Sequence, residues 1–345
     1  MEKRAGASPA PTGLVSDSGS PIIGDWGASC SPGGKEQAMT STTNPIEIEF
    51  RDALIEARLL IPSGVPGVFG RGHVFEDILE RFDALITKTG RADGAEKVRF
   101  PPALSRADFQ QSGFLKSFPQ LAGTLFSFDG TPREHLQMMD AIHEGKDWAE
   151  YETMTDVAFT PAACYPVYPM AAARGAVPDG GRLFDVFSYC FRHEPSDDPA
   201  RMQLFRMREY VLVGTAESVI PWRDSWIERG QSLLRSVGLL VECDLANDPF
   251  FGRGGRMLAL DQREQSLKFE LVIPICSTEK PTAIMSFNYH QDHFGTAFGL
   301  RSESGEVAHT ACVGFGMERI VLALLKTHGL NPDTWPAPVR ERLWA

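Results

Sequence analysis

Apolar residues recur at helical spacing in several parts of the chain. Between residues 73 and 89, Phe75, Ile78, Leu79 and Phe82 follow one another at intervals of three or four residues or less. This spacing gives one apolar stripe and predicts a helix. Helices are also predicted over 216–238 and 315–328, and the segment 45–61 is expected to be mostly helical.

Strand-like runs dominate the second half of the chain. They lie at 183–193, 203–213, 268–276, 282–289 and 307–313. Hairpin-like turns or long connections join them, without the regular βαβ spacing of a parallel sheet, which favours a largely antiparallel sheet. A further short strand, EKVRFPPAL, is interrupted by Pro101 and Pro102. The pattern therefore predicts an α+β fold with helices beside an antiparallel sheet.

Composition separates the N-terminus from the rest of the chain. Residues 1–44 are rich in Gly, Ser, Pro and Ala without periodicity, which predicts a disordered extension, with Met39 as a candidate natural start. Residues 45–345 are then one structured domain. The N-terminus has no apolar core of a secretory signal, and no apolar run is long enough for a bilayer, so no membrane partner is expected.

Charge and cysteine usage narrow the function further. The 345 residues carry a formal net charge of -11, which argues against a protein whose main function is to bind nucleic acid. The six cysteines are widely scattered, as reduced thiols in a cytoplasm would be.

The stretch FRHEPSDDPARMQLFRMREYVLVG, residues 191–214, predicts a hairpin with many fixed charges. Because strand side chains alternate, one face of the second strand would hold Arg201, Gln203, Phe205, Met207 and Glu209. Arg192 and Glu194 share a face of the first strand. Guanidiniums suit phosphate oxygens and an aromatic ring suits a nucleobase. The alternative is a solvated hairpin with incidental salt bridges.

A second stretch, VGFGMERIVLALL at 313–325, predicts a strand, a glycine turn and an amphipathic helix. Gly314 and Gly316 permit close backbone approach. Arg319 lies in the first helical turn, where a cation suits an anionic ligand better than it suits helix stability.

Together these stretches resemble the catalytic core of class II aminoacyl-tRNA synthetases over about residues 70–330. VFEDILERFDALI with EKVRFPPAL resembles motif 1, FRHE with RMQLFRMRE resembles motif 2, and VGFGMERIVLALL resembles motif 3. The segment TPAACYPVYPMAAARG and the short motif 2 turn are similar to atypical seryl-tRNA synthetases of methanogens. The chain is most similar to their truncated bacterial relatives, the amino acid:carrier protein ligases. The resemblance implies a class II antiparallel sheet flanked by helices and a homodimer.

The resemblance also implies roles for single residues in binding ATP with Mg²⁺. Arg192 would clamp the α-phosphate, Glu194 would contact the adenine amino group, and Phe205 would stack on adenine. Arg201 and Arg319 would hold the outer phosphates, with Met202 and Ala283 also contacting ATP. Arg192 and Arg319 would be the catalytic residues, and Asn288 and Glu209 would contact the amino acid. Thr282 stands where family members often carry an acid that helps bind metal.

Cys164, Glu209 and Cys312 match the zinc ligands of the atypical family. Their spacing alone does not predict a metal site, because no closely spaced cysteine pair exists. Cys190, Cys243 and Cys276 are interpreted as ordinary thiols. By resemblance, the three ligands would leave a fourth zinc position for the α-amine of the substrate.

The acceptor of the activated amino acid is predicted to be a carrier protein. About thirty structured residues precede motif 1, too few for a tRNA-binding domain. The phosphopantetheine thiol of a holo-carrier protein would take a small amino acid, and the resemblance alone favours glycine or alanine. Arg253 and Arg256 in DPFFGRGGRM could face an acidic partner or belong to an ordinary solvated loop.

Two rival functions remain open at this point. One is a minimal seryl-type class II synthetase that charges tRNA. The other is a non-catalytic paralogue that binds amino acids or nucleotides. The presence of Arg192, Glu194, Phe205 and Arg319 argues against the second.

Overall fold

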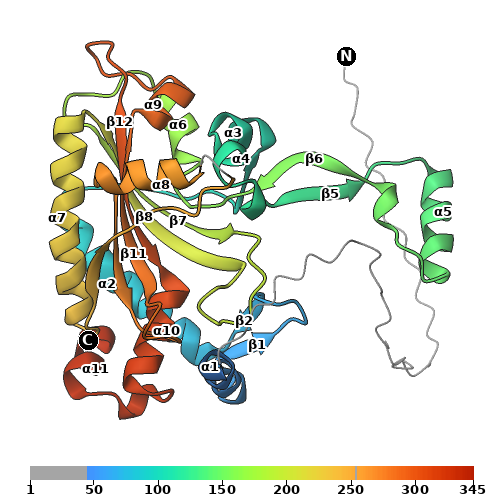
Figure 1. Cartoon of the computed structure of the whole chain (residues 1–345), viewed down its shortest axis with the longest axis horizontal. Helices are drawn as coiled ribbons and strands as arrows, with labels where there is room; N and C mark the ends of the chain where they lie inside the picture. Colours follow the sequence, from blue (N-terminus) through green and yellow to red (C-terminus); the bar gives the residue numbers. More distant parts are fainter. Residues whose placement is uncertain (1–44, 253–254) are drawn as a thin grey trace, which may run out of the picture. The chain divides into compact units, whose positions relative to one another are not determined.

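A computed structural model describes residues 45–252 and 255–345 of the chain (Figure 1). The predicted N-terminal extension, residues 1–44, and Arg253 lie outside the described residues. None of the helices in the described ranges has the length and apolar composition that crossing a bilayer requires.

A seven-stranded sheet forms the centre of the fold. Its spatial order is β3 (Glu96–Val98), β7 (Arg182–Phe191), β8 (Leu204–Gly214), β12 (His309–Gly316), β11 (Thr282–Gln291), β10 (Lys268–Ile273) and β9 (Glu242–Leu245). All neighbours pair antiparallel except β3 and β7, which are parallel. The five strands predicted in the second half are all present, with ends that differ by a few residues. The α+β prediction is confirmed.

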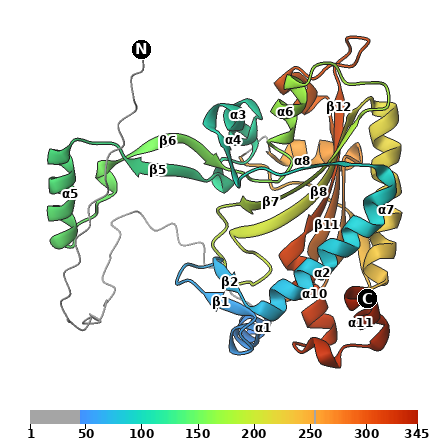
Figure 2. The same cartoon turned by 180° about the vertical axis from the view of Figure 1, so that it is seen from behind.

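Three long helices pack on one face of this sheet. They are α2 (His73–Gly90), α7 (Ala216–Arg235) and α10 (Met317–His328), and they share one apolar core with the strand residues that point toward them. Figure 2 shows α2 and α10 side by side across this face. The apolar stripe predicted for 73–89 is buried: Phe75, Ile78, Leu79 and Phe82 all lie in this core.

The opposite face carries two short helices, α6 (Val167–Ala173) and α9 (His293–Phe298), around a second apolar cluster. The remaining helices are α1 (Pro45–Glu56), α3 (Arg106–Gln111), α4 (Phe114–Ser117), α5 (Pro132–His143), α8 (Gly255–Glu264) and α11 (Ala337–Trp344). Short 3-10 turns lie at η1 (Arg91–Asp93), η2 (Pro119–Leu121), η3 (Ala149–Tyr151) and η4 (Pro332–Thr334).

Two smaller sheets complete the described chain. One pairs β1 (Leu60–Pro62) with β2 (Phe69–Arg71). The other has the order β4 (Ala103–Ser105), β6 (Glu152–Phe159) and β5 (Thr124–Phe128). The strands β5 and β6 run away from the central sheet and carry α5 at their far end (Figure 1, Figure 2).

The segment 45–61 is mostly helical, as predicted: α1 ends at Glu56, and Arg58 then adopts a left-handed φ of 57°, which no α-helix can continue through. One short element differs from the sequence prediction. The run EKVRFPPAL forms two strands in different sheets, β3 and β4. Its two prolines lack the backbone N–H that a continuous ladder needs.

The alternation of side chains along β8 divides its charges between the two faces. Arg206 and Arg208 point toward the long helices and are buried. The backbone N and Nε of Arg206 donate to the Glu318 carboxylate at 2.6 and 2.8 Å, and its two terminal nitrogens donate to Glu76 at 2.6 and 2.7 Å. These guanidiniums therefore join β8 to α10 and α2.

Arg208 makes the equivalent connection one position pair further along β8. Its Nε and Nη2 donate to the Asp185 carboxylate of β7 at 3.0 and 2.7 Å. Its Nη1 donates to the Asp83 carboxylate of α2 at 2.9 Å. Arg206 and Arg208, two of the arginines of the charged hairpin, thus hold the sheet to its helical layer.

We expect Glu318→Gln to lower the free energy of unfolding by about 3 kcal/mol, because it leaves buried guanidiniums undercompensated. Glu318 is 2 % exposed and also pairs with Arg71 at 3.2 Å. The matched control is Glu144→Gln, which removes an exposed pair with Lys146 and should leave stability unchanged. Chemical denaturation of both variants measures the difference, and equal stabilities would contradict a stabilising role for the buried network.

Candidate active site

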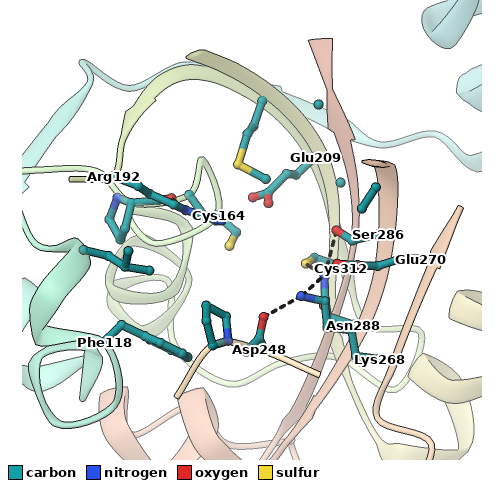
Figure 3. Close-up of a pocket in the computed structure, with 18 of the residues that line it drawn as sticks. Phe118, Cys164, Arg192, Glu209, Asp248, Lys268, Glu270, Ser286, Asn288 and Cys312 are labelled. Atoms are coloured by element: carbon teal, nitrogen blue, oxygen red, sulfur yellow. Dashed lines mark hydrogen bonds and ion pairs between the residues drawn. The ribbon is translucent and has the colours of Figure 1, made fainter. Parts of the chain in front are cut away.

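A cavity of about 620 Å³ opens on the face of the sheet opposite α2 and α10 (Figure 3). Every site residue predicted from the sequence lines it: Cys164, Arg192, Glu194, Arg201, Met202, Phe205, Glu209, Ala283, Asn288, Cys312 and Arg319. Phe205, Met207 and Glu209 reach it because they alternate with the buried arginines along β8. The cavity therefore collects side chains from segments far apart in the sequence.

One predicted member of the hairpin surface is misplaced. Gln203 does not line the cavity in the described structure; its Nε2 donates to the Pro66 carbonyl at 2.7 Å. The reason is local, since β8 begins only at Leu204 and the strict alternation does not extend to residue 203. Of the two loop arginines, Arg253 lies outside the described residues, and nothing is described of the Arg256 side chain.

Three guanidiniums gather at one end of the cavity. Arg319 is fixed by hydrogen bonds from Nε to the Ala200 carbonyl at 2.8 Å and from Nη1 to the Ala283 carbonyl at 3.0 Å. Arg192 is held by a bond from Nε to the Pro161 carbonyl at 3.0 Å. Burial lowers the pKa of Arg319, and the charges of Arg192 and Arg201 lower it further. Concentrated positive charge of this kind favours a polyanionic ligand.

An aromatic ring and a carboxylate accompany these cations. The Arg192 guanidinium lies 5.6 Å from the centroid of the Phe205 ring, within the range of a cation–π contact. Glu194 pairs with the exposed Arg201 at 3.4 Å. These residues thus offer guanidinium groups that can bind phosphate beside the flat apolar ring of Phe205.

The cavity also holds a cluster of potential metal ligands. Cys164, Glu209 and Cys312 are buried, and one ligand atom from each lies within 4.8 Å of the others. In Figure 3 the three side chains surround one small space. Glu209 comes from β8 and Cys312 from the neighbouring β12, where Glu209 pairs with Gly314. Cys164 precedes α6.

The electrostatics of this cluster fit a cation. Burial raises the pKa of Glu209 to about 8, and the negative charge of Cys312 adds to the shift. The two thiols interact: a hydrogen bond from Cys164 lowers the pKa of Cys312, and the same bond raises that of Cys164. The Oε2 atom of Glu209 is buried and has no hydrogen-bond partner among the residues that the structure describes. An orphaned carboxylate oxygen beside two cysteines is a donor set that suits Zn²⁺.

Several polar residues of the cavity wall were missed from the sequence. Lys268 of β10 forms ion pairs with Asp248 and Glu270 (Figure 3). Burial opposes the charged form, but Asp248 and Glu270 still raise the pKa of Lys268. Lys268 and Asn288 are cross-strand partners in the sheet. Because Lys268 and Glu270 are two residues apart in a strand, the sequence could have placed them on one face. Asp248 could not be found in this way, because it belongs to a separate loop.

Aromatic side chains border the cavity on the side of α4 and α8. Phe118 and Phe250 stack with ring centroids 5.1 Å apart. The Phe251 backbone N donates to the Ser117 carbonyl at 2.9 Å, which ties the loop before α8 to α4. This part of the cavity gives an apolar passage beside the polar wall.

Comparison with curated proteins finds two similar sequences from Bradyrhizobium diazoefficiens. Amino acid–acyl-carrier-protein ligase 1 is 49% identical over 286 residues, which covers 83% of this chain and 87% of the relative. Amino acid–acyl-carrier-protein ligase 2 is 49% identical over 280 residues, covering 81% and 84%. The type-2 serine–tRNA ligase of Methanopyrus kandleri is 27% identical over 76% of this chain. The chain spans only 53% of that relative's length.

Solved structures share the fold. Seryl-tRNA synthetase of M. kandleri, solved with A. aeolicus tRNASec, matches with a TM-score of 0.73 at 20% identity, covering 85% of this chain and 59% of that one. Prolyl-tRNA synthetase of Giardia lamblia, solved with prolyl-adenylate, matches with a TM-score of 0.60 at 12% identity, covering 81% and 52%. The predicted class II synthetase fold is confirmed. No family model matches the chain.

We expect the purified protein to hold about one zinc ion per chain, as a three-ligand site would. Cys164→Ser and Cys312→Ser should lose it, because a neutral hydroxyl replaces a thiolate ligand. Cys243→Ser, which changes an exposed cysteine outside the cluster, is the matched control. Metal analysis of the dialysed proteins measures the content, and full zinc in both cluster variants would contradict the assignment.

Proposed function

The chain belongs to the family of amino acid–acyl-carrier-protein ligases, and on this premise we propose how it works. We propose that it joins a small amino acid to ATP as an aminoacyl-adenylate. It then transfers the aminoacyl group to the phosphopantetheine thiol of a carrier protein. The observation that carries the proposal is one cavity lined by three guanidiniums and by three potential metal ligands.

The three guanidiniums of the cavity are proposed to bind ATP. A carboxylate oxygen of the amino acid attacks the α-phosphorus, and pyrophosphate leaves. Arg192 would neutralise the α-phosphate, while Arg319 and Arg201 would hold the outer phosphates. Such a step needs positioning and charge neutralisation more than a protein nucleophile. The reduced dielectric around half-buried Arg319 strengthens its attraction for an anion.

The base of ATP is proposed to lie on Phe205, within reach of Glu194. Met202 and the backbone of Ala283, which both line the cavity, would complete the nucleotide contacts. Glu270 is a cavity carboxylate whose charge acts on Arg319. It is therefore a candidate ligand for Mg²⁺ on the phosphates, in place of the acid that Thr282 does not supply.

The cluster of potential metal ligands is proposed to hold zinc, which when bound would supply a Lewis-acidic position for the substrate amine. Cys164, Glu209 and Cys312 would be the ligands. Asn288 would orient the amino acid from β11; its Nδ2 lies 3.3 Å from the Ser286 Oγ and 3.3 Å from the Cys312 Sγ.

Glycine or alanine is favoured as the substrate, as the resemblance to the carrier protein ligases implies. The wall beside the proposed ligands is closely packed, since a Cβ built on Gly314 would lie 3.0 Å from the Ser286 Oγ, 3.5 Å from Glu209 and 3.6 Å from Met207.

The second half-reaction is proposed to use the aromatic passage. The thiol sulfur attacks the carbonyl carbon of the adenylate, AMP leaves, and the thiol proton is released. Phe118 and Phe250 would line the path of the phosphopantetheine arm, which is long and partly apolar. Arg253 and Arg256, which closely follow Phe250 in the sequence, remain our candidates for contact with an acidic carrier.

Two further properties are part of the proposal. The class II fold supports a homodimer, which light scattering of the purified protein would test. The scattered cysteines support a reducing, cytoplasmic setting. Charging of tRNA is the rival function, favoured by the likeness to type-2 serine–tRNA ligases. Efficient charging of tRNA with no transfer to holo-carrier protein would decide for the rival.

We expect Arg319→Ala to reduce amino-acid-dependent ATP–pyrophosphate exchange by about 10²-fold or more, because it removes a guanidinium proposed to bind phosphate. Exchange is first measured with all twenty amino acids to find the substrate. Arg106→Ala, which removes an exposed arginine that pairs with Asp156 outside the cavity, is the control. Zinc content should not change in either variant. Near-normal exchange in Arg319→Ala would remove this residue from the site.

We expect the product to be a thioester that hydroxylamine cleaves and that does not form on apo-carrier lacking the arm. Reversing both Arg253 and Arg256 to Glu should weaken transfer to the carrier several-fold while sparing pyrophosphate exchange, because activation precedes docking. Mass analysis of the carrier measures transfer. Unchanged transfer by this double variant would remove the two arginines from the docking surface.

A further inference from the structure

The sulfur of Cys312 has polar neighbours that reach it from β11. The Asn288 Nδ2 donates to the Cys312 Sγ at 3.3 Å, and the His290 Nε2 lies 3.6 Å from the same atom. The other ring nitrogen of His290, Nδ1, lies 3.0 Å from the Oγ1 of buried Thr310. If the Thr310 hydroxyl donates to Nδ1, the ring proton is on Nε2 and faces the sulfur.

Tyr168 lies in the first turn of α6, four residues after Cys164. Its side chain is fully buried, and its hydroxyl has no hydrogen-bond partner among the described residues. Its ring meets the His290 ring edge-on, with centroids 6.2 Å apart. Tyr168 therefore packs against the residue that contacts the Cys312 sulfur.

Aromatic packing leaves both rings little freedom to turn away. Tyr168 stacks on Phe294 with centroids 3.9 Å apart and an interplanar angle of 10°. His290 meets the same Phe294 ring edge-on at 5.0 Å. A buried hydroxyl held in this way without a partner is costly. It becomes satisfied once the neighbouring sulfur carries a full negative charge, because a thiolate accepts hydrogen bonds far better than a thiol does.

Charge balance gives a reason for these donors. Two thiolates and one carboxylate carry three negative charges against the two positive charges of a zinc ion, and Arg192, whose charge acts on Glu209, offsets part of the excess. The excess charge is buried, and buried charge must be met by hydrogen bonds. Donors on the ligand atoms also fix the ligands in place and moderate how much charge the sulfurs give to the metal.

We propose that Tyr168 and His290 are positioning residues of the metal site, which donate hydrogen bonds to the ligating sulfurs of Cys164 and Cys312 respectively. Thr310 fixes the His290 ring in the tautomer that donates. This inference rests on the metal of the proposed function. It adds that the affinity and electron density of the metal depend on residues that do not ligate it.

The test measures the metal itself, so its outcome does not depend on activity. Zinc affinity is measured by competition with a chromogenic chelator, and the protein loaded with Co²⁺ is examined by its thiolate-to-cobalt absorption. Tyr168→Phe and His290→Leu should each bind zinc about 10-fold more weakly. Their charge-transfer bands should move to longer wavelength, because an unbonded thiolate gives up its electrons more easily. His290→Gln, which keeps an N–H donor, should restore much of the affinity.

The control is Tyr210→Phe, which deletes a buried hydroxyl that bonds the Ile86 carbonyl on the helical face of β8. It should leave zinc affinity and the cobalt spectrum unchanged. Should His290→Leu fail to fold, Thr310→Val keeps the ring in place, removes only its partner, and should also weaken zinc binding.

Wild-type affinity and spectrum in both Tyr168→Phe and His290→Leu would overturn the inference. So would a wild-type protein that takes up neither zinc nor cobalt. Pyrophosphate exchange by the same wild-type preparation separates the two failures. Exchange that persists with unaffected metal binding refutes the positioning role alone, whereas a wild type without exchange refutes the proposed function.

Discussion

The two-residue alternation of β8 is the constraint on which the rest of the structure depends. Its even positions bury guanidiniums against carboxylates of α2, α10 and β7. Its odd positions present an aromatic ring, a thioether and a carboxylate to the cavity. A slip of one residue in strand pairing would exchange these sets, placing unpaired charges in the apolar core. The buried ion pairs therefore set the register that places Glu209 beside Cys312.

The same division explains why the site can be rigid without being densely bonded. On the cavity side, Arg192 and Arg319 are anchored by backbone carbonyls, which leaves guanidinium nitrogens free to meet a ligand. Of the three anchors, Ala283 lies in β11 itself, Ala200 in the loop between β7 and β8, and Pro161 just after β6. Groups that are already oriented need no reorganisation when charge develops on a phosphate. The scaffold thus does its work before the substrate arrives.

The sequence was most informative where periodicity or a motif was local. The stripe beginning at Phe75 gave α2, and the stretches that resemble motifs 2 and 3 gave Arg192, Phe205 and Arg319, which all line one cavity. The prediction failed where a boundary decided the outcome, as at Gln203 just before β8. Asp248 and Tyr168 stand in stretches that the sequence singles out, but no pattern there indicated what either side chain would contact. Their surroundings arise from contacts between distant segments, which a single sequence does not display.

The metal ligands have a consequence for the life of the protein beyond its chemistry. Cys164, Glu209 and Cys312 belong to segments spread over much of the chain, so an unfolded chain cannot bring them together cheaply. An ion held there would bind the native state and not the denatured one, acting as a removable cross-link. Native-state stability then rises with the logarithm of free metal concentration. Metal scarcity would reduce how many molecules survive proteolysis, not only how fast each one turns over.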